Sequence, residues 1–119
     1  MAQARYMLLN GKYLEDAERL LEAGDSPQAS EKLWGAVAEM VKAVATGRGW
    51  RHFSHRELRE AVERLFQETG DADLVRLFAE AESLHANFYE NWMSLDTVKL
   101  YAEDARRLVE KLRPLAATR

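Results

Sequence analysis

The chain has 119 residues and a formal net charge of −3, and 47% of its residues are hydrophobic. This length is typical of one domain and is sufficient to bury a core without metal or disulfide cross-links. The sequence contains no cysteine, which excludes a disulfide scaffold, a thiolate zinc site and a cysteine nucleophile. We therefore expect one domain over residues 1–119, with no metal site and no cofactor.

Apolar runs are short throughout the chain, and none approaches the roughly 18 residues that a membrane-spanning helix needs. The first residues, Met1 to Arg5, lack the continuous apolar segment of a signal peptide. These features predict a cytoplasmic protein without membrane contact. Arginine outnumbers lysine 12 to 5, a pattern found in some thermophilic proteins.

The first predicted helix spans about residues 2–23. Its apolar face comprises Tyr6, Tyr13, Ala17, Leu20 and Leu21. We expect Gly24 to end this helix, because glycine enters the left-handed conformation freely. In the following segment, Ser26 is expected to cap the second helix and Pro27 to occupy its first turn.

The second predicted helix, about residues 27–46, has the clearest periodicity. Residues at the 3.6-residue period are Ala29, Leu33, Ala36, Val37, Met40, Val41 and Val44, and Trp34, Ala38 and Ala45 widen the apolar face. Glu31 and Glu39 belong to the narrow polar stripe that we expect to face water. Because a helix that is apolar around most of its circumference contacts several neighbours, this one is predicted to be central and the most buried.

Three further helices follow in the chain. Ser54 and Glu57 form a capping-box pattern that begins the third helix, and residues 69–71 end it. The fourth is predicted over about residues 72–90, and Asp96 is expected to cap the fifth after a turn over residues 91–95. Short connections force antiparallel neighbours, so the predicted fold is an all-α, up-and-down bundle of about five helices.

Residues 48–59 are the most unusual segment. Four arginines, Arg48, Arg51, Arg56 and Arg59, stand against one glutamate, a net of +3 in an otherwise acidic chain. Guanidinium groups bind phosphate, and Trp50 and Phe53 can stack on bases. The segment therefore predicts contact with RNA or a nucleotide. The alternative is an arginine-rich loop whose aromatic residues close the end of the bundle.

Two histidines lie in the same segment, three positions apart. His52 and His55 could take and give protons in RNA cleavage, with Arg48 stabilising the charge that develops on phosphorus. Arg48, His52 and His55 are thus the catalytic candidates if the protein is a ribonuclease. The alternative is a solvated loop without catalytic function.

Residues 84–90 form the second candidate site. The helical pattern predicts that His85 points inward, as a core histidine satisfied by one hydrogen bond, whereas Asn87 and Glu90 point outward. Tyr89, at the edge of the apolar face, is expected to fix the tautomer of His85. His85, Asn87 and Tyr89 join the arginines and Trp50 as ligand-binding candidates, and Trp92 is interpreted as an aromatic plug.

Several of these segments resemble one family. The run from Gln28 to Ala38 after Gly24-Asp25 is similar to the second helix of HEPN-type domains. The 48–50 turn, the 54–58 segment and residues 84–90 resemble the archaeal PaREP branch of that superfamily, and the resemblance covers about residues 5–112.

This resemblance implies a four-helix core with an extra short helix, a homodimer, and nucleotide or RNA binding. It also implies a minimal nucleotidyltransferase as a partner, as in a toxin–antitoxin pair. Arg48 and His55 match the Arg-x(4–6)-His ribonuclease motif of many HEPN domains, although at a different place in the chain. Three functions follow: a non-catalytic nucleotide- or RNA-binding module, a metal-independent ribonuclease, and a protein-interaction module.

Overall fold

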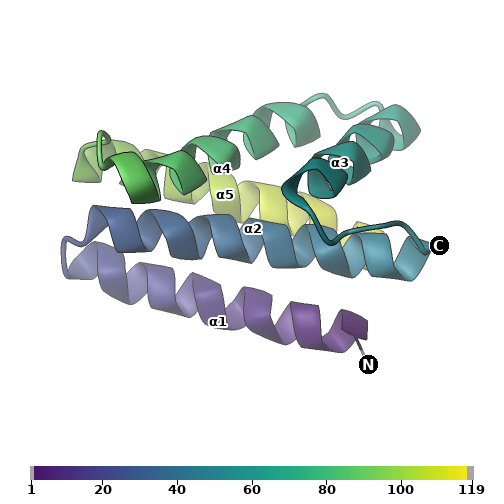
Figure 1. The fold of residues 1–119 in the computed structure, drawn as a ribbon, viewed down its shortest axis with the longest axis horizontal. Coiled ribbons are helices and arrows are strands. Elements are labelled where there is room, and N and C mark those ends of the chain that lie inside the picture. Colours follow the sequence, from purple (N-terminus) through teal and green to yellow (C-terminus); the bar gives the residue numbers. More distant parts are fainter. Residues whose placement is uncertain (1, 118–119) are drawn as a thin grey trace.

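The computed structural model describes residues 2–117, which form five helices and no strand (Figure 1). The helices are α1 (Ala2–Glu22), α2 (Ser26–Arg48), α3 (His55–Thr69), α4 (Asp73–Glu90) and α5 (Leu95–Ala116). The all-α bundle predicted from the sequence is confirmed. None of the helices over residues 2–117 combines the length and the apolarity needed to cross a membrane.

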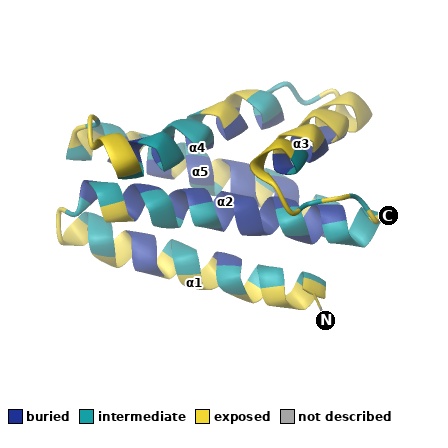
Figure 2. Ribbon diagram, in the orientation of Figure 1, coloured by how far each residue is buried: buried dark blue, intermediate teal, exposed yellow. Residues whose placement is uncertain are grey.

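Helix α2 is the centre of the bundle, and it packs against each of the other four helices. Its side chains Leu33, Val37, Met40, Val41 and Val44 are completely buried. Figure 2 shows buried residues along most of α2, whereas the outer faces of α1 and α3 are exposed. The prediction that this helix is the most buried element is confirmed, because its apolar residues leave only a narrow polar stripe.

The helix ends differ from the sequence prediction in three details. Asp25, not Ser26, caps α2, because its side chain accepts a hydrogen bond from the backbone N–H of Gln28. Helix α2 continues past residue 46 to Arg48, and Gly49 ends it in the left-handed conformation at φ 73°. Ser94, not Asp96, caps α5 by accepting a hydrogen bond from Thr97 N–H.

Glu39 was expected to face water, and this prediction is wrong. Glu39 is only 6% exposed, and its carboxylate forms an ion pair with Lys42 at 2.8 Å. The reason is that α1, which lies alongside α2, covers part of the polar stripe of α2 (Figure 1). Helix α1 is otherwise an outer layer of the molecule (Figure 1).

Candidate functional site

Four aromatic rings form a continuous row across α2, α3 and α4. The centroid of Trp34 lies 4.9 Å from that of His55 and 5.1 Å from that of His85, which stacks on the indole. The ring of Tyr89 follows, 5.6 Å from His85 in an edge-to-face arrangement. We call Trp34, His55, His85 and Tyr89 the ring row.

Local structure explains how each ring reaches this row. Trp34 lies at the edge of the apolar face of α2 and is 9% exposed. His55 is the first residue of α3, directly after the capping Ser54, and His85 precedes Tyr89 by about one turn of α4. Trp34 is therefore the buried member of the row, and the other three rings reach the surface. The His55 side chain is 46% exposed, the His85 side chain 31%, and the Tyr89 residue 70%.

A glutamate holds each histidine of the row. His55 Nε2 lies 2.7 Å from Glu82 Oε2, and His85 Nδ1 lies 2.8 Å from Glu31 Oε1. Such contacts fix the orientation of an imidazole and occupy one of its two nitrogens. No hydrogen bond to His55 Nδ1 or His85 Nε2 occurs within residues 2–117.

A cation lies beside this arrangement. Arg59 donates to Glu82 Oε2 from Nη2 at 2.6 Å and from Nε at 3.1 Å. The hydrogen bond to Glu82 and its negative charge raise the pKa of Arg59 above its ordinary value. The arginine is thus a permanent cation next to His55, and its side chain remains 57% exposed.

A polar groove between α1 and α2 adjoins the ring row. It has a volume of about 360 Å³; Trp34 belongs to both features, and Glu31, which pairs with His85 of the ring row, also lines the groove. The other lining residues are Tyr13, Gln28, Lys32, Gly35, Ala38, Glu39 and Lys42. A Cβ atom added at Gly35 would lie 3.0 Å from the Tyr13 ring, so the absence of a side chain there lets α1 approach α2 closely.

The basic segment does not form one uniform surface. Arg48 reaches the far end of α3, where its Nη1 donates to both carboxylate oxygens of Glu68 at 2.6 and 2.7 Å. Its side chain is only 10% exposed. Glu68 follows His55 by thirteen positions on α3, about 20 Å along a helix. Arg48 and His55, which match the ribonuclease spacing in the sequence, therefore do not meet.

Hydrogen-bonding contacts to other parts of the fold surround His52. Its Nδ1 donates to the Trp50 carbonyl at 2.9 Å, while Nε2 lies 3.2 Å from Tyr6 Oη and 3.3 Å from Thr46 Oγ1. These contacts connect the 49–54 segment to α1 and α2. The structure brings His55 together with His85 instead of with His52.

The remaining residues of the basic segment lie in different environments. Trp50 is partly buried beneath the guanidinium groups of Arg48 and Arg64, at 5.4 and 4.1 Å from its ring. Arg51 and Arg56 are 86% and 87% exposed and pair with Glu57 and Glu60. The backbone N–H groups of Phe53 and Ser54 also bind Glu57, and this lowers its pKa.

The prediction that Asn87 points outward is wrong. Asn87 is completely buried, and its Nδ2 donates to Ser30 Oγ at 2.9 Å. Its Oδ1 accepts hydrogen bonds from the backbone N–H groups of Trp92 and Met93, at 2.9 and 2.8 Å. Asn87 therefore joins α2 to the α4–α5 turn and is not accessible to a ligand.

Two aromatic predictions nearby also need correction. Trp92 was expected to plug the end of the bundle, but it is 64% exposed. Tyr89 contacts the edge of the His85 ring, but it is Glu31 that hydrogen-bonds to His85 and fixes its orientation. Glu31 was assigned to the solvent-facing stripe because its partner, His85, lies on another helix, and the periodicity of one helix does not reveal such a pairing.

Sequence reasoning missed three residues of this site: Glu31, Trp34 and Glu82. Trp34 was interpreted only as a core residue, and it is indeed buried, yet it supports both imidazoles. The spacing of Glu82 and His85 on α4 was an available signal, since residues three apart lie on one helix face. The pairing of Glu82 with His55 depends on the packing of α3 against α4, which periodicity does not specify.

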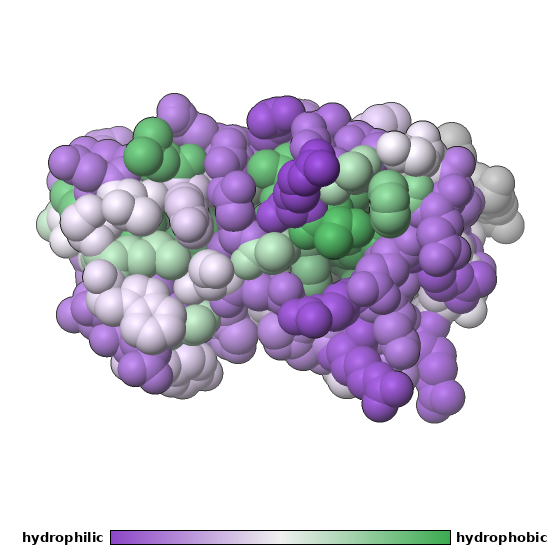
Figure 3. Space-filling view, turned by 90° about the horizontal axis from the view of Figure 1, so that it is seen from above, coloured by the Kyte–Doolittle hydropathy of each residue, from purple (hydrophilic) through white to green (hydrophobic). Residues whose placement is uncertain are grey.

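The face over α3 and α4 has a mixed apolar and polar character (Figure 3). In Figure 3, hydrophobic atoms on this face occur in separate areas with hydrophilic side chains between them. Large, continuous apolar patches mark obligate protein interfaces. The mixed surface is better suited to a ligand that has both rings and charges.

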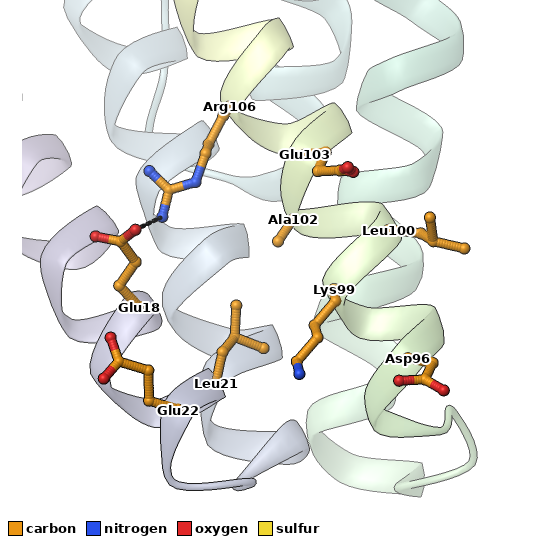
Figure 4. A pocket seen from close by; sticks show the side chains of 9 residues that line it. All are labelled: Glu18, Leu21, Glu22, Asp96, Lys99, Leu100, Ala102, Glu103 and Arg106. Carbon is orange, nitrogen blue, oxygen red and sulfur yellow. Dashed lines mark ion pairs between the residues drawn. The ribbon is translucent and has the colours of Figure 1, made fainter.

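A second groove, of about 610 Å³, lies between α1 and α5. In Figure 4, Lys99 and Arg106 of α5 extend toward Glu18 and Glu22 of α1, and Arg106 pairs with Glu18 at 3.8 Å. Four carboxylates line the groove against two cations, and neither a histidine nor an aromatic ring lines it. The ring row therefore offers the richer binding chemistry.

Within residues 2–117, no group of three or more histidine and carboxylate side chains is arranged to hold a metal ion. The ring row instead provides aromatic surfaces and two imidazoles, and the guanidinium group of Arg59 lies beside it. These groups suit a nucleotide, whose base stacks and whose phosphate accepts hydrogen bonds.

Comparison with known proteins places the chain in a family. A crystal structure of a protein from Sulfolobus solfataricus is similar, with a TM-score of 0.80 and 26% sequence identity. The similarity covers 90% of this chain and 95% of that one. No curated protein matches the chain. Residues 5–109 match the sequence model of the archaeal PaREP1/PaREP8 family, so the chain belongs to that family.

Proposed function

We propose that the protein is a non-catalytic module that binds nucleotides or single-stranded RNA on the ring row. The observation that carries this proposal is the row itself: the partly exposed rings of His55 and His85 pack on Trp34, and the exposed ring of Tyr89 follows that of His85. Aromatic rows of this kind bind successive bases by stacking. Arg59, with the exposed Arg56 one turn before it on α3, supplies charge for phosphate.

Arg56 and Arg59 pair with Glu60 and Glu82, and both arginines can still bind phosphate. Arg56 and Glu60 are exposed, and pairs of this kind contribute little to stability, so a phosphate group can replace the glutamate. Arg59 has five N–H donors and uses two of them on Glu82. Its remaining donors are sufficient for a phosphate oxygen.

The experiment is a titration of a fluorescently labelled eight-nucleotide RNA at several salt concentrations. Affinity should fall with salt, and the double variant Arg56→Ala/Arg59→Ala should both weaken binding and flatten the salt dependence. Arg76→Ala/Arg113→Ala removes the same charge from other parts of the surface and serves as the control. Equal behaviour of the two double variants, or no binding by the wild type, contradicts the proposal.

A second candidate function is metal-independent RNA cleavage, and the paired imidazoles favour it. His55 and His85 each keep one nitrogen turned away from a glutamate, as a general base and a general acid require. Incubation of RNA with the protein in a chelator tests this function. Cleavage should then be lost in both His55→Ala and His85→Ala and should show a bell-shaped pH profile.

A homodimer and a nucleotidyltransferase partner remain proposals that come from the resemblance to HEPN domains. Trp92 and Tyr89 are large, exposed side chains near the α4–α5 turn. Because large apolar side chains at a surface favour association, they support a protein–protein contact there. Light scattering at micromolar concentration tests the dimer.

A further inference from the structure

The groove between α1 and α5 has an apolar base. Within residues 2–117 both helices pack on α2 but hardly contact each other, so a groove of about 610 Å³ lies between them. In Figure 4, the partly buried Leu21 and the buried Ala102 lie between the two helices. Leu100, two positions before Ala102 on α5, lines the same groove and is 63% exposed. The groove thus presents apolar side chains that no other element of the fold covers.

The charged residues of this groove are predominantly acidic. Four carboxylates lie on its two sides, those of Glu18 and Glu22 on α1 and of Asp96 and Glu103 on α5 (Figure 4). Among them, only Glu18 forms an ion pair within residues 2–117, with Arg106 at 3.8 Å. Lys99 is the other cation, so four carboxylates against two cations leave a net charge of −2. Such a surface repels phosphate and attracts a cationic partner.

From the apolar base and the acidic sides, we infer that this groove binds a basic amphipathic helix of a partner protein. Apolar side chains three or four positions apart on that helix contact Leu21 and Leu100. Its lysine and arginine side chains, on either edge of the apolar face, contact the carboxylates that have no ion pair in the chain itself. Residues 96–106 of α5 extend over about 15 Å, the length of about three helical turns, which is sufficient for such a contact.

The probe for this inference is a synthetic peptide with leucines on one helical face and lysines on the other. Calorimetric titration should detect binding at micromolar concentration, and circular dichroism should show that the bound peptide becomes helical. One control peptide has the same composition in scrambled order, and a second has glutamate in place of lysine. Both controls should bind at least about tenfold more weakly, because they lack the apolar face or the complementary charge.

Variants of the groove should change the affinity for the basic peptide in opposite directions. Glu22→Lys should weaken binding about tenfold, whereas Lys99→Ala should strengthen it, because the two changes alter the charge of the groove with opposite sign. Leu100→Ser should also weaken binding. Leu8→Ser, at a 77% exposed position of α1 outside the groove, and Glu63→Lys on α3 are the matched controls and should leave the affinity unchanged.

Three results would overturn the inference. The first is no binding of the basic peptide, or equal binding of all three peptides. The second is an affinity that Glu22→Lys and Leu100→Ser leave unchanged. The third is self-association of the wild type that Leu100→Ser abolishes in light scattering, because a second copy of the chain then occupies the groove. RNA binding is tested separately, since the groove and the ring row share no residue.

Discussion

The imidazole rings of His55 and His85 lie 6.0 Å apart, centroid to centroid, although they belong to different helices. Both rings pack on Trp34 of the central helix, so the packing of α2 against α3 and α4 determines their separation. A buried tryptophan cannot shift without disturbing the core. The two histidines are therefore held in place by the same packing that stabilises the fold.

His52 and His55 should respond differently to substitution. His52→Ala removes three part-buried contacts and should lower the free energy of unfolding by about 1–2 kcal/mol. His55→Ala removes an exposed hydrogen bond to Glu82, which should cost about 1 kcal/mol or less, but it should weaken RNA binding. Urea unfolding and RNA titration of both variants check this. The reverse pattern, with His52 needed only for binding, would show that the site is assigned to the wrong histidine.

Asn87 should be among the most sensitive polar residues of the chain. Asn87→Ala leaves two backbone N–H groups without their partner and removes the donor to Ser30 Oγ, which keeps only its bond to the Ser26 carbonyl, at a cost of about 3 kcal/mol. Glu90→Ala, at an exposed position near the end of the same helix, should change stability by less than about 0.5 kcal/mol. Thermal unfolding measures both. A loss below 1 kcal/mol in Asn87→Ala would mean that water replaces the amide.

Gly11 and Gly35 both lie inside helices, so their alanine variants can be compared directly. At Gly11, an added Cβ meets no atom within 4 Å, so Gly11→Ala should raise the free energy of unfolding by about 0.5–1 kcal/mol. At Gly35, the added Cβ contacts the Tyr13 ring at 3.0 and 3.2 Å, and Gly35→Ala should lose this gain or destabilise the protein. Chemical denaturation compares the two variants. An equal gain at both positions would show that α1 is loosely packed on α2.

The stability should depend on pH through Glu80. Burial, together with the hydrogen bond to Asp104 and its negative charge, raises the pKa of Glu80 from 4.5 to about 7. The folded state then holds this proton more tightly than the unfolded state, so the contribution is complete below pH 4.5 and is lost as pH rises through about 7. Glu80→Gln should flatten the decrease in stability between pH 5 and 8, and Glu103→Gln should not. A wild-type stability that increases over this range while Glu80→Gln is unchanged would contradict the assignment.

The fold could be predicted because hydrophobic periodicity and helix caps are local signals. The second helix shows this well, since the residues from Ala29 to Val44 that follow the helical period are all buried. The errors at the caps are also local. Asp25 and Ser26 are both good capping residues, as are Ser94 and Asp96, and backbone conformation decides between neighbours.

The site could be predicted only in part, because its geometry depends on contacts between helices. The sequence drew attention to His55, His85, Tyr89 and Arg59, but it grouped His55 with its neighbours in the chain. The structure separates Arg48 and His52 from this group and adds Glu31 and Glu82. Asn87 was misplaced because helical periodicity assigns a polar residue to the surface, whereas here the backbone N–H groups of the turn after α4 satisfy the oxygen of its buried amide.

The most direct test of ligand binding on the ring row is an NMR titration of the labelled protein with a short single-stranded RNA. The largest shift changes should occur in the side chains of His55, His85 and Tyr89 and in the backbone around Glu31 and Arg59. They should be absent from the groove between α1 and α5 that contains Glu18 and Arg106. Changes confined to that groove, or no change at millimolar RNA, would contradict the account.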